Sequence, residues 1–408
     1  MNKVDLLQLI EAGESSTLEF KRDDCRPEQI AREAVAMANS LGGVIILGIE
    51  DDRTTSGLAR KNTEEWVMDS VFGRKIHPVL IPHYQEFDLQ GGRVAALIVP
   101  QGTTKPYVVR HNEREDIYVR IGSTTRLATR EQQARLFTSG GMLHTELLPV
   151  SGATINTFDL QRVQDYLANF VGEMNIPQSA DEWERRLCDF GLMVETDYGI
   201  RLGTIAGVVL FAHRPRRLLP QAGIRLMVFE GDELDYSAKV DYYIDEPAIG
   251  RWLVSTNGVR ENIANGLLES FAAIVRPHIF REETAINIGL RKDTKALYPW
   301  QALRELVVNA LAHRDWTRLD EITITIFSDR LEVFSPGALV NSMTVEKMKA
   351  GLRNTRNPVI ADILRDYGYA DRRGMGVRKK VLPPYNNTTQ PTFEATEDHL
   401  RVVLPRLE

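Results

Sequence analysis

Three polar side chains recur at four-residue intervals within an apolar segment near the C-terminus. They are Glu305, Asn309 and His313, in the segment from Leu303 to His313. Residues four apart share one face of an α-helix, so the spacing predicts a helix that carries all three on one face. An amide oxygen suits Mg²⁺, and a carboxylate one turn earlier can orient an attacking water. The face therefore suits ATP chemistry, and the alternative is a solvated polar stripe.

The segment from Ala302 to Asp315 resembles the first nucleotide box of the GHKL ATPases. The closer resemblance is to a divergent subfamily described as the C-terminal domain of RecG-like helicases. It implies that Glu305 orients the water and that Asn309 is the Mg²⁺ ligand. We expect His313, on the same helical face, to belong to the cofactor site. The expected cofactors are ATP and Mg²⁺.

The second element of this resemblance is a pair of predicted strands, from Glu321 to Phe327 and from Arg330 to Phe334. They end in Ser335-Pro336-Gly337, where the main family has an Asp-x-Gly-x-Gly box. The adenine-reading Asp is absent, so either Ser335 reads the adenine through a water or nucleotide selection is loose. Ser335 and Gly337 are the nucleotide contacts expected here.

The third element is the glycine-rich turn from Arg372 to Gly376, which precedes a predicted helix. Backbone N–H groups of such a turn can hold phosphate oxygens. We expect the phosphate contacts to come from Arg373, Gly374 and Gly376. The surrounding excess of Lys and Arg suits polyphosphate, or equally forms a solvated face.

Three N-terminal segments, 14–21, 36–52 and 118–125, resemble the AlbA-like domain shared with the Schlafen proteins. The resemblance implies binding of DNA or RNA. In some Schlafens three carboxylates cut RNA with a metal ion, and the matching residues are Glu14, Glu19 and Glu50, with Asp51 as an alternative third ligand. Such a cluster on Mg²⁺ or Mn²⁺ can activate a water. The alternative is that Glu19 and Lys21 form an ion pair that holds the fold, while Glu50 caps a turn.

The stretch from Lys105 to Arg135 has more Lys and Arg than Asp and Glu, with tyrosines between them. Backbone neutralisation and base stacking would use such a stretch, although a solvated sheet edge is the commoner role. The expected nucleic-acid contacts are Lys21, Lys105, Arg110, Arg120 and Arg126. Among them Arg120, on a predicted strand, is the strongest candidate for a phosphate contact.

The pattern predicts a mixed α/β (α+β) protein of three domains, 1–138, 139–297 and 298–408. The first is the AlbA-like domain and the last a GHKL-like sandwich. We expect a helix over 29–41 and a buried strand over 44–49. In the middle we expect a helical unit over 159–202 that could form a helix-turn-helix, a strand over 204–211 and a long helix over 249–275.

The 408 residues carry a formal net charge of −6, which argues against a wholly basic nucleic-acid coat. No apolar run approaches the ~20 residues that span a bilayer, and no export signal is visible, so we expect a cytoplasmic protein. Two cysteines are too few for a disulfide framework or a structural zinc site. The chain lacks a Gly-x-x-x-x-Gly-Lys-Ser/Thr loop, so it lacks the motor of a translocating helicase.

Three functions remain open at this point. The first is an ATP-binding regulator that controls nucleic-acid binding, with a homo-oligomer implied because GHKL relatives often dimerise on nucleotide. The second is a metal-dependent endonuclease licensed by ATP, serving phage defence. The third is a nucleotide-sensing scaffold without catalysis.

Overall fold

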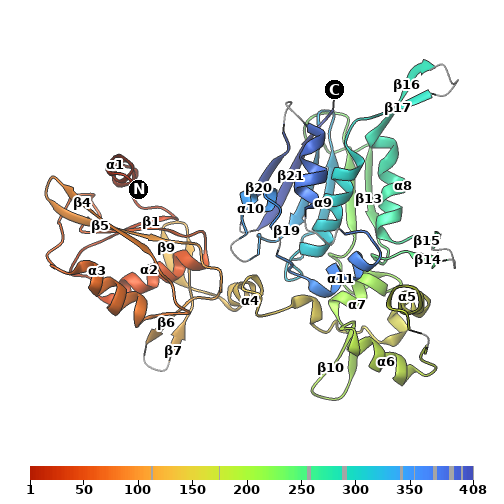
Figure 1. Cartoon of the computed structure of the whole chain (residues 1–408), viewed down its shortest axis with the longest axis horizontal. Coiled ribbons are helices and arrows are strands. Elements are labelled where there is room, and N and C mark those ends of the chain that lie inside the picture. The colour runs from red at the N-terminus through yellow and green to blue at the C-terminus, as the bar shows by residue number, and fades with distance from the viewer. Residues whose placement is uncertain are drawn as a thin grey trace. The chain divides into compact units, whose positions relative to one another are not determined.

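The computed structural model describes most of the chain in two compact units (Figure 1). The described residues are 1–111, 114–173, 175–254, 259–286, 292–340, 343–352, 354–370, 375–385, 390–396 and 398–407. Residues 1–143 form the first unit, and the described residues from 144 to 339 and from 343 to 407 form the second. The mixed α/β class predicted from the sequence is confirmed.

The first unit is built around a four-stranded sheet of order β1-β2-β5-β4. Its strands are β1 (Leu18–Lys21), β2 (Gly43–Leu47), β4 (His83–Leu89) and β5 (Gly92–Val99), and only the β1–β2 pair is parallel. Helices α1 (Lys3–Ala12) and α2 (Pro27–Asn39) cover its two faces (Figure 1).

Strand β2 is apolar throughout because both of its faces are buried. Ile45 and Leu47 pack in a cluster with residues of α2, whereas Ile46 packs with Leu6 and Ile10 of α1. Successive side chains of a strand point to opposite faces, so a strand covered on both sides lacks the polar alternation of a half-exposed one. The strand and helix predicted for this region are confirmed.

Smaller elements complete the first unit. They are α3 (Thr63–Trp66) with the π-helical turn Val67–Gly73, the strands β3 (Ile76–His77), β6 (Val108–His111) and β7 (Arg114–Asp116), the hairpin of β8 (Tyr118–Ile121) and β9 (Thr124–Leu127), and α4 (Arg130–Ser139). The order of the three-stranded sheet is β3-β6-β7.

A six-stranded sheet of order β13-β12-β18-β19-β21-β20 organises the second unit. The strands are β12 (Ile224–Val228), β13 (Val240–Ile244), β18 (Ile322–Ile326), β19 (Arg330–Pro336), β20 (Thr392–Ala395) and β21 (His399–Pro405). Only β12 and β18 pair in parallel. Helix α8 (Leu267–Ile279) packs against β12 and β13, and α9 (Trp300–His313) packs against β19. The sheet therefore combines strands that precede residue 297 in the sequence with strands that follow it, although a domain boundary was predicted there.

The middle of the chain contributes mainly helices. They are α5 (Leu160–Tyr166) with the π-helical turn Leu167–Val171, α6 (Ala180–Asp189) and α7 (Ile205–Phe211), with the hairpin of β10 (Met193–Glu195) and β11 (Arg201–Gly203) before α7. The strand predicted over 204–211 was wrong, because this segment is α7. Thr204 caps it by accepting from the N–H of Gly207 at 3.1 Å, and every residue of α7 is buried. A short apolar segment that is buried on all sides has no polar residues at regular spacing, so its sequence does not distinguish a helix from a strand.

The helix predicted over 249–275 was wrong in its first half. Strands β14 (Arg251–Val254) and β15 (Arg260–Ala264) pair there as a hairpin, and α8 begins only at Leu267. The remaining elements are β16 (Phe280–Ile286), β17 (Lys292–Ala296), α10 (Val345–Lys349), α11 (Pro358–Asp366) and the π-helical turn Val377–Val381, with 3₁₀ turns at Thr145–Leu147, Ile155–Thr157, Pro215–Arg217 and Pro383–Tyr385. Within the described residues, no helix has the length and apolarity that a membrane crossing requires.

Candidate functional site

Helix α9 presents the polar face that the sequence predicts. Glu305, Asn309 and His313 lie one turn apart on it, while the other positions from Ala302 to Ala312 are buried except for the half-buried Arg304. Glu305 is itself only 6% exposed. A carboxylate this buried needs partners, because burying an unpaired charge is costly. The face is therefore not a solvated stripe.

Three groups meet at the Glu305 carboxylate. Asn309 Nδ2 donates to Oε1 at 3.3 Å, and Lys380 Nζ lies 3.0 Å from Oε2. Gly376 supplies the third contact, since a Cβ atom built on it would lie 1.7 Å from Glu305 Oε1. No side chain fits at position 376 without displacing the carboxylate. The structure thus brings the first box and the end of the glycine-rich turn together, far apart as they are in sequence.

The hydrogen bond from Asn309 fixes which way its amide points. The amide nitrogen is the donor of the side chain, so it faces the Glu305 carboxylate. The Asn309 carbonyl oxygen is then directed away from Glu305, and such an oxygen is a ligand that Mg²⁺ prefers. The residues present fit a magnesium ion on Asn309.

His313, at the last turn of α9, is a neutral group. Burial, and then the positive charge of Arg356, lower the pKa of His313 to about 4. At neutral pH its ring therefore has one donor and one acceptor nitrogen and no net charge. It can hydrogen-bond a ligand in the site without adding positive charge.

A buried polar network fixes the end of α9. Arg356 NH1 pairs with Asp315 Oδ2 at 2.7 Å, and Asn357 Nδ2 donates to the carbonyl oxygens of Ala312 at 3.1 Å and Arg314 at 2.9 Å. Burial opposes ionisation of Asp315, but Arg356 and the bonds from Thr317 outweigh it and hold its pKa below the usual value. The sequence pattern predicted no role for Arg356 or Asn357; the only signal was their place before the glycine-rich turn.

Arg314 is fully buried beside this network. Its guanidinium donates to the carbonyl oxygens of Gln221, Arg318 and Asp320 and lies 4.3 Å from the centre of the Trp316 ring. Burial lowers the pKa of Arg314 to about 10, so it stays charged at neutral pH. These bonds tie the loop after α9 to the segment that precedes β12.

Ser335 lies near the end of strand β19 and Gly337 directly follows the strand, next to this network. Ser335 is 7% exposed, and Gly337 has a φ of 111°, which only glycine adopts readily. A Cβ on Gly337 would lie 2.5 Å from Asp315 Cβ, so this glycine is required by the close approach of the α9 loop. Arg373 and Gly374, the other predicted phosphate contacts, lie outside the described residues.

In the first unit the three predicted metal carboxylates have separate partners. Glu14 Oε1 accepts from the N–H of Phe20 at 3.0 Å, and Glu50 Oε1 lies 3.6 Å from Arg22 Nε. Glu19 pairs with Lys21, as the alternative interpretation holds, and also with Arg120. Asp51 is exposed. No group of three His, Cys, Asp or Glu side chains suited to a metal occurs in the described parts of the chain.

Arg120 lies in the interior rather than on a nucleic-acid surface. Its side chain is 2% exposed, and NH1 pairs with Glu19 and Glu33, both at 2.8 Å. NH2 donates to the backbone carbonyls of Ser15 and Leu18. The structure places this guanidinium where it joins β8 to β1 and α2, instead of at the surface expected for a phosphate contact. The alternation of polar and apolar residues along the strand could not predict that Arg120 is buried, because its partners come from distant segments.

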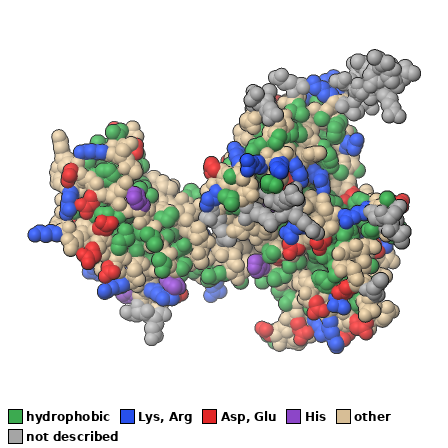
Figure 2. Space-filling model, in the orientation of Figure 1, with side chains coloured by type: hydrophobic (Ala, Val, Ile, Leu, Met, Phe, Trp, Pro, Cys, Tyr) green, Lys and Arg blue, Asp and Glu red, His purple; other side chains and the backbone are tan. Residues whose placement is uncertain are grey.

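The other basic residues predicted to contact nucleic acid differ in whether they already pair with groups of the protein. Lys105 Nζ donates to the Ser40 carbonyl at 3.1 Å, and Arg110 pairs with Glu115 at 2.8 Å. Arg126, on β9, is exposed and makes no ion pair with the described residues. Basic and acidic side chains alternate over the face of this unit seen in Figure 2, where the unit lies on the left.

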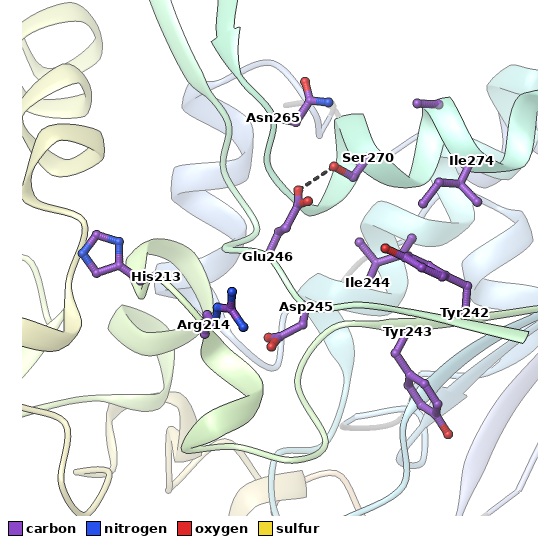
Figure 3. Close-up of a pocket in the computed structure, with 11 residues that line it drawn as sticks. His213, Arg214, Tyr242, Tyr243, Ile244, Asp245, Glu246, Asn265, Ser270 and Ile274 are labelled. Atoms are coloured by element: carbon purple, nitrogen blue, oxygen red, sulfur yellow. Dashed lines mark hydrogen bonds between the residues drawn. The ribbon is translucent and has the colours of Figure 1, made fainter.

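A separate cavity of about 610 Å³ lies beside β13 and α8 (Figure 3). Its polar lining includes Asp245, which accepts from the N–H of Arg216 at 2.9 Å, and Glu246, which accepts from the hydroxyl of Ser270 at 2.5 Å. Arg214 and Tyr242 also line it. Both carboxylates thus already hold donors from their own chain, and none of the α9 residues lines this cavity.

Comparisons with known proteins match two parts of the chain. Residues 14–129 match the family described as "Schlafen, AlbA_2", and residues 320–404 match the family described as "Putative ATP-dependent DNA helicase recG C-terminal". No curated protein matches the chain.

Among solved structures, a protein from Corynebacterium diphtheriae is 20% identical, covers 99% of this chain and 80% of its own, and has a TM-score of 0.44. The N-terminal domain of a RecG-related protein from Nitrosomonas europaea is 25% identical, covers 32% of this chain and 94% of its own, and has a TM-score of 0.24. The family matches confirm both resemblances seen in the motifs: residues 14–129 are Schlafen AlbA_2-like, and residues 320–404 are RecG C-terminal-like.

Proposed function

We propose that the second unit binds ATP with Mg²⁺ and that the first unit binds nucleic acid, so that nucleotide regulates nucleic-acid binding. The observation that carries the proposal is the meeting of Asn309, Gly376 and Lys380 at the buried carboxylate of Glu305. Asn309 would hold the magnesium ion, and Glu305 would orient a water. The two family matches associate the chain with ATP and with nucleic acid.

The nucleotide part is tested by titration calorimetry with ATP, with and without Mg²⁺. We expect Asn309→Ala to lose the Mg²⁺-dependent part of binding, because it removes an oxygen ligand. Glu305→Gln should keep binding and lose any hydrolysis, because the amide cannot take a proton from water. Gln301→Ala, at an exposed position of the same helix, is the matched control. Wild-type protein without affinity for ATP would refute the assignment.

The nucleic-acid part is tested by fluorescence anisotropy with labelled DNA and RNA at several salt concentrations. Affinity should fall as salt rises, because bound phosphates release counterions. Arg126→Ala should weaken binding to all sequences and reduce the salt slope by about 1, as expected for one phosphate contact. Arg110→Ala, which removes a cation paired with Glu115, should have a smaller effect. Binding that ignores both salt and Arg126 would exclude this surface.

The regulatory part links the two units. We expect ATP with Mg²⁺ to change the affinity for nucleic acid, and self-association on nucleotide is the proposed route. Light scattering with and without ATP measures the mass of the assembly. A nucleic-acid affinity that ATP leaves unchanged would reduce the proposal to two independent binding functions.

A further inference from the structure

The cation that pairs with Glu305 lies on the segment expected to meet phosphate. Lys380 belongs to the π-helical turn Val377–Val381, which follows directly on the glycine-rich turn. Its side chain is 25% exposed, whereas that of Glu305 is 8% exposed. Lys380 therefore extends from the site's margin onto the buried carboxylate, and charge alone did not distinguish it from the neighbouring Arg378 and Lys379.

Glu305 has both oxygens engaged in this arrangement. Oε1 accepts from Asn309, and Oε2 accepts from Lys380 at 3.0 Å. A carboxylate that is to orient a water needs a lone pair facing that water, and an ammonium in contact with it competes for this position. The bond from Asn309 can persist when a cation binds the Asn309 carbonyl oxygen, because it uses the other end of the amide. The contact with Lys380 is the one that has to open.

A polyphosphate can open this contact. The ammonium of lysine is a compact charge on a flexible four-carbon stem, and it binds phosphate as a point charge. The triphosphate of a nucleotide carries several negative charges, whereas Glu305 offers one. Gly376 lies against Glu305 and directly precedes the π-helical turn, so a phosphate held by the Gly376 backbone would lie next to the segment that carries Lys380.

We propose that Lys380 senses the polyphosphate of a nucleoside triphosphate: it neutralises Glu305 when no nucleotide is bound and moves to the phosphates when one binds. Glu305 is then free to orient a water only when a triphosphate is present. This inference rests on the proposed ATP site and adds to it a residue that couples occupancy to the release of the base.

The first test needs no nucleotide. Lys380→Met should lower the urea midpoint of the second unit, because it leaves a buried carboxylate without its cation. Adding Glu305→Gln should recover much of that loss, since the charge that Lys380 compensates is then gone. Lys379→Met, which removes an exposed charge next to Lys380, is the control and should leave the midpoint unchanged. Effects of Lys380→Met and Glu305→Gln that simply add would overturn the pairing.

The second test compares ATP, ADP and adenosine by calorimetry. Lys380→Met should weaken ATP binding about tenfold or more, as expected for the loss of one charge-assisted contact, and leave adenosine binding unchanged. Lys380→Arg keeps the charge and should retain most of the ATP affinity. An equal loss for ATP and adenosine, or no loss for either, would overturn the sensing role.

The two tests separate this inference from the proposed function. Wild-type protein that binds no ATP would refute the nucleotide site and the sensing role together, while the urea experiment still reports on the ion pair. Wild-type protein that binds ATP, with Lys380→Met unaltered in its preference for ATP over adenosine, would refute only the role of Lys380.

Discussion

Arg120 shows how much of the first unit depends on a single buried cation. Its guanidinium pairs with two carboxylates, of Glu19 and Glu33, and Thr125 donates to Glu33 at 2.6 Å. We expect Arg120→Met to destabilise the unit by about 3 to 5 kcal/mol, because two partly or fully buried carboxylates lose their shared partner. Urea denaturation followed by circular dichroism measures the loss.

The matched control is Arg126→Met, an exposed arginine on the partner strand of the same hairpin. It should change stability by less than about 0.5 kcal/mol. If the Arg120→Met protein is as stable as wild type but fails to bind nucleic acid, Arg120 is a phosphate contact and not a structural residue.

At the scale of elements, helix α11 begins on a carboxylate from a distant segment. Asn357 precedes the helix, and its amide nitrogen donates to the end of α9, but its side chain makes no capping hydrogen bond to α11. Glu146 caps the helix instead, because its oxygens accept from the N–H groups of Val359 at 2.9 Å and Ile360 at 3.0 Å. Free N–H groups and the helix dipole at an N-terminus favour such an anion.

Burial nevertheless makes ionised Glu146 costly. It raises the pKa of Glu146 to about 7, against the opposing effect of the two N–H bonds. Between the ordinary pKa of about 4.5 and this value, the unfolded chain is ionised at Glu146 while the folded chain holds the proton. This contribution to stability is therefore complete below about pH 4.5, falls as pH rises towards 7 and then levels off.

We expect the stability difference between wild type and Glu146→Gln to depend on pH over this window. Wild type should lose up to about 3 kcal/mol relative to the variant between pH 4.5 and pH 7.5, because glutamine does not titrate. Urea titrations at a series of pH values measure the difference. Curves that run parallel across the window would show that Glu146 keeps an ordinary pKa in the folded protein.

The sequence predicted features that depend on neighbouring residues and missed features that depend on residues far apart in the chain. The polar face of α9 depends on residues one turn apart, and the spacing of Glu305 and Asn309 predicted it correctly. The partner Lys380 and the cap on α11 come from other segments, so no local pattern could reveal them. The prediction of a strand over 204–211 was wrong for a related reason. This segment is buried on all sides by the rest of the unit, so its own sequence does not decide between strand and helix.

At the scale of the whole molecule, the two units have separate apolar cores. The clusters of the first unit lie between Leu6 and Leu136, and the large cluster of the second lies between Val150 and Leu404. Units with their own cores can unfold independently. We expect calorimetry to show two transitions. Arg120→Met should lower only one of them, and the pH-dependent change from Glu146→Gln should appear only in the other.

Substitutions at exposed positions, such as Arg126→Met and Gln301→Ala, serve as controls for the two units and should leave both transitions in place. A single transition that Arg120→Met and Glu146→Gln both shift would mean that the units unfold as one cooperative body.

The strand order of the second unit has a consequence for synthesis on the ribosome. Ile224 pairs in parallel with Ile322, and β21, at 399–405, lies between β19 and β20 inside the sheet. Residues 1–143 contain the apolar clusters of the first unit, so this unit can fold while the rest of the chain is still being made. The sheet of the second unit has to wait for an inner strand from the far end of its sequence, and such long-range pairing is slow. The nascent chain therefore carries a folded first unit for as long as the second unit is still unfolded. Under the function proposed above, nucleic acid bound by that nascent chain would escape control by ATP.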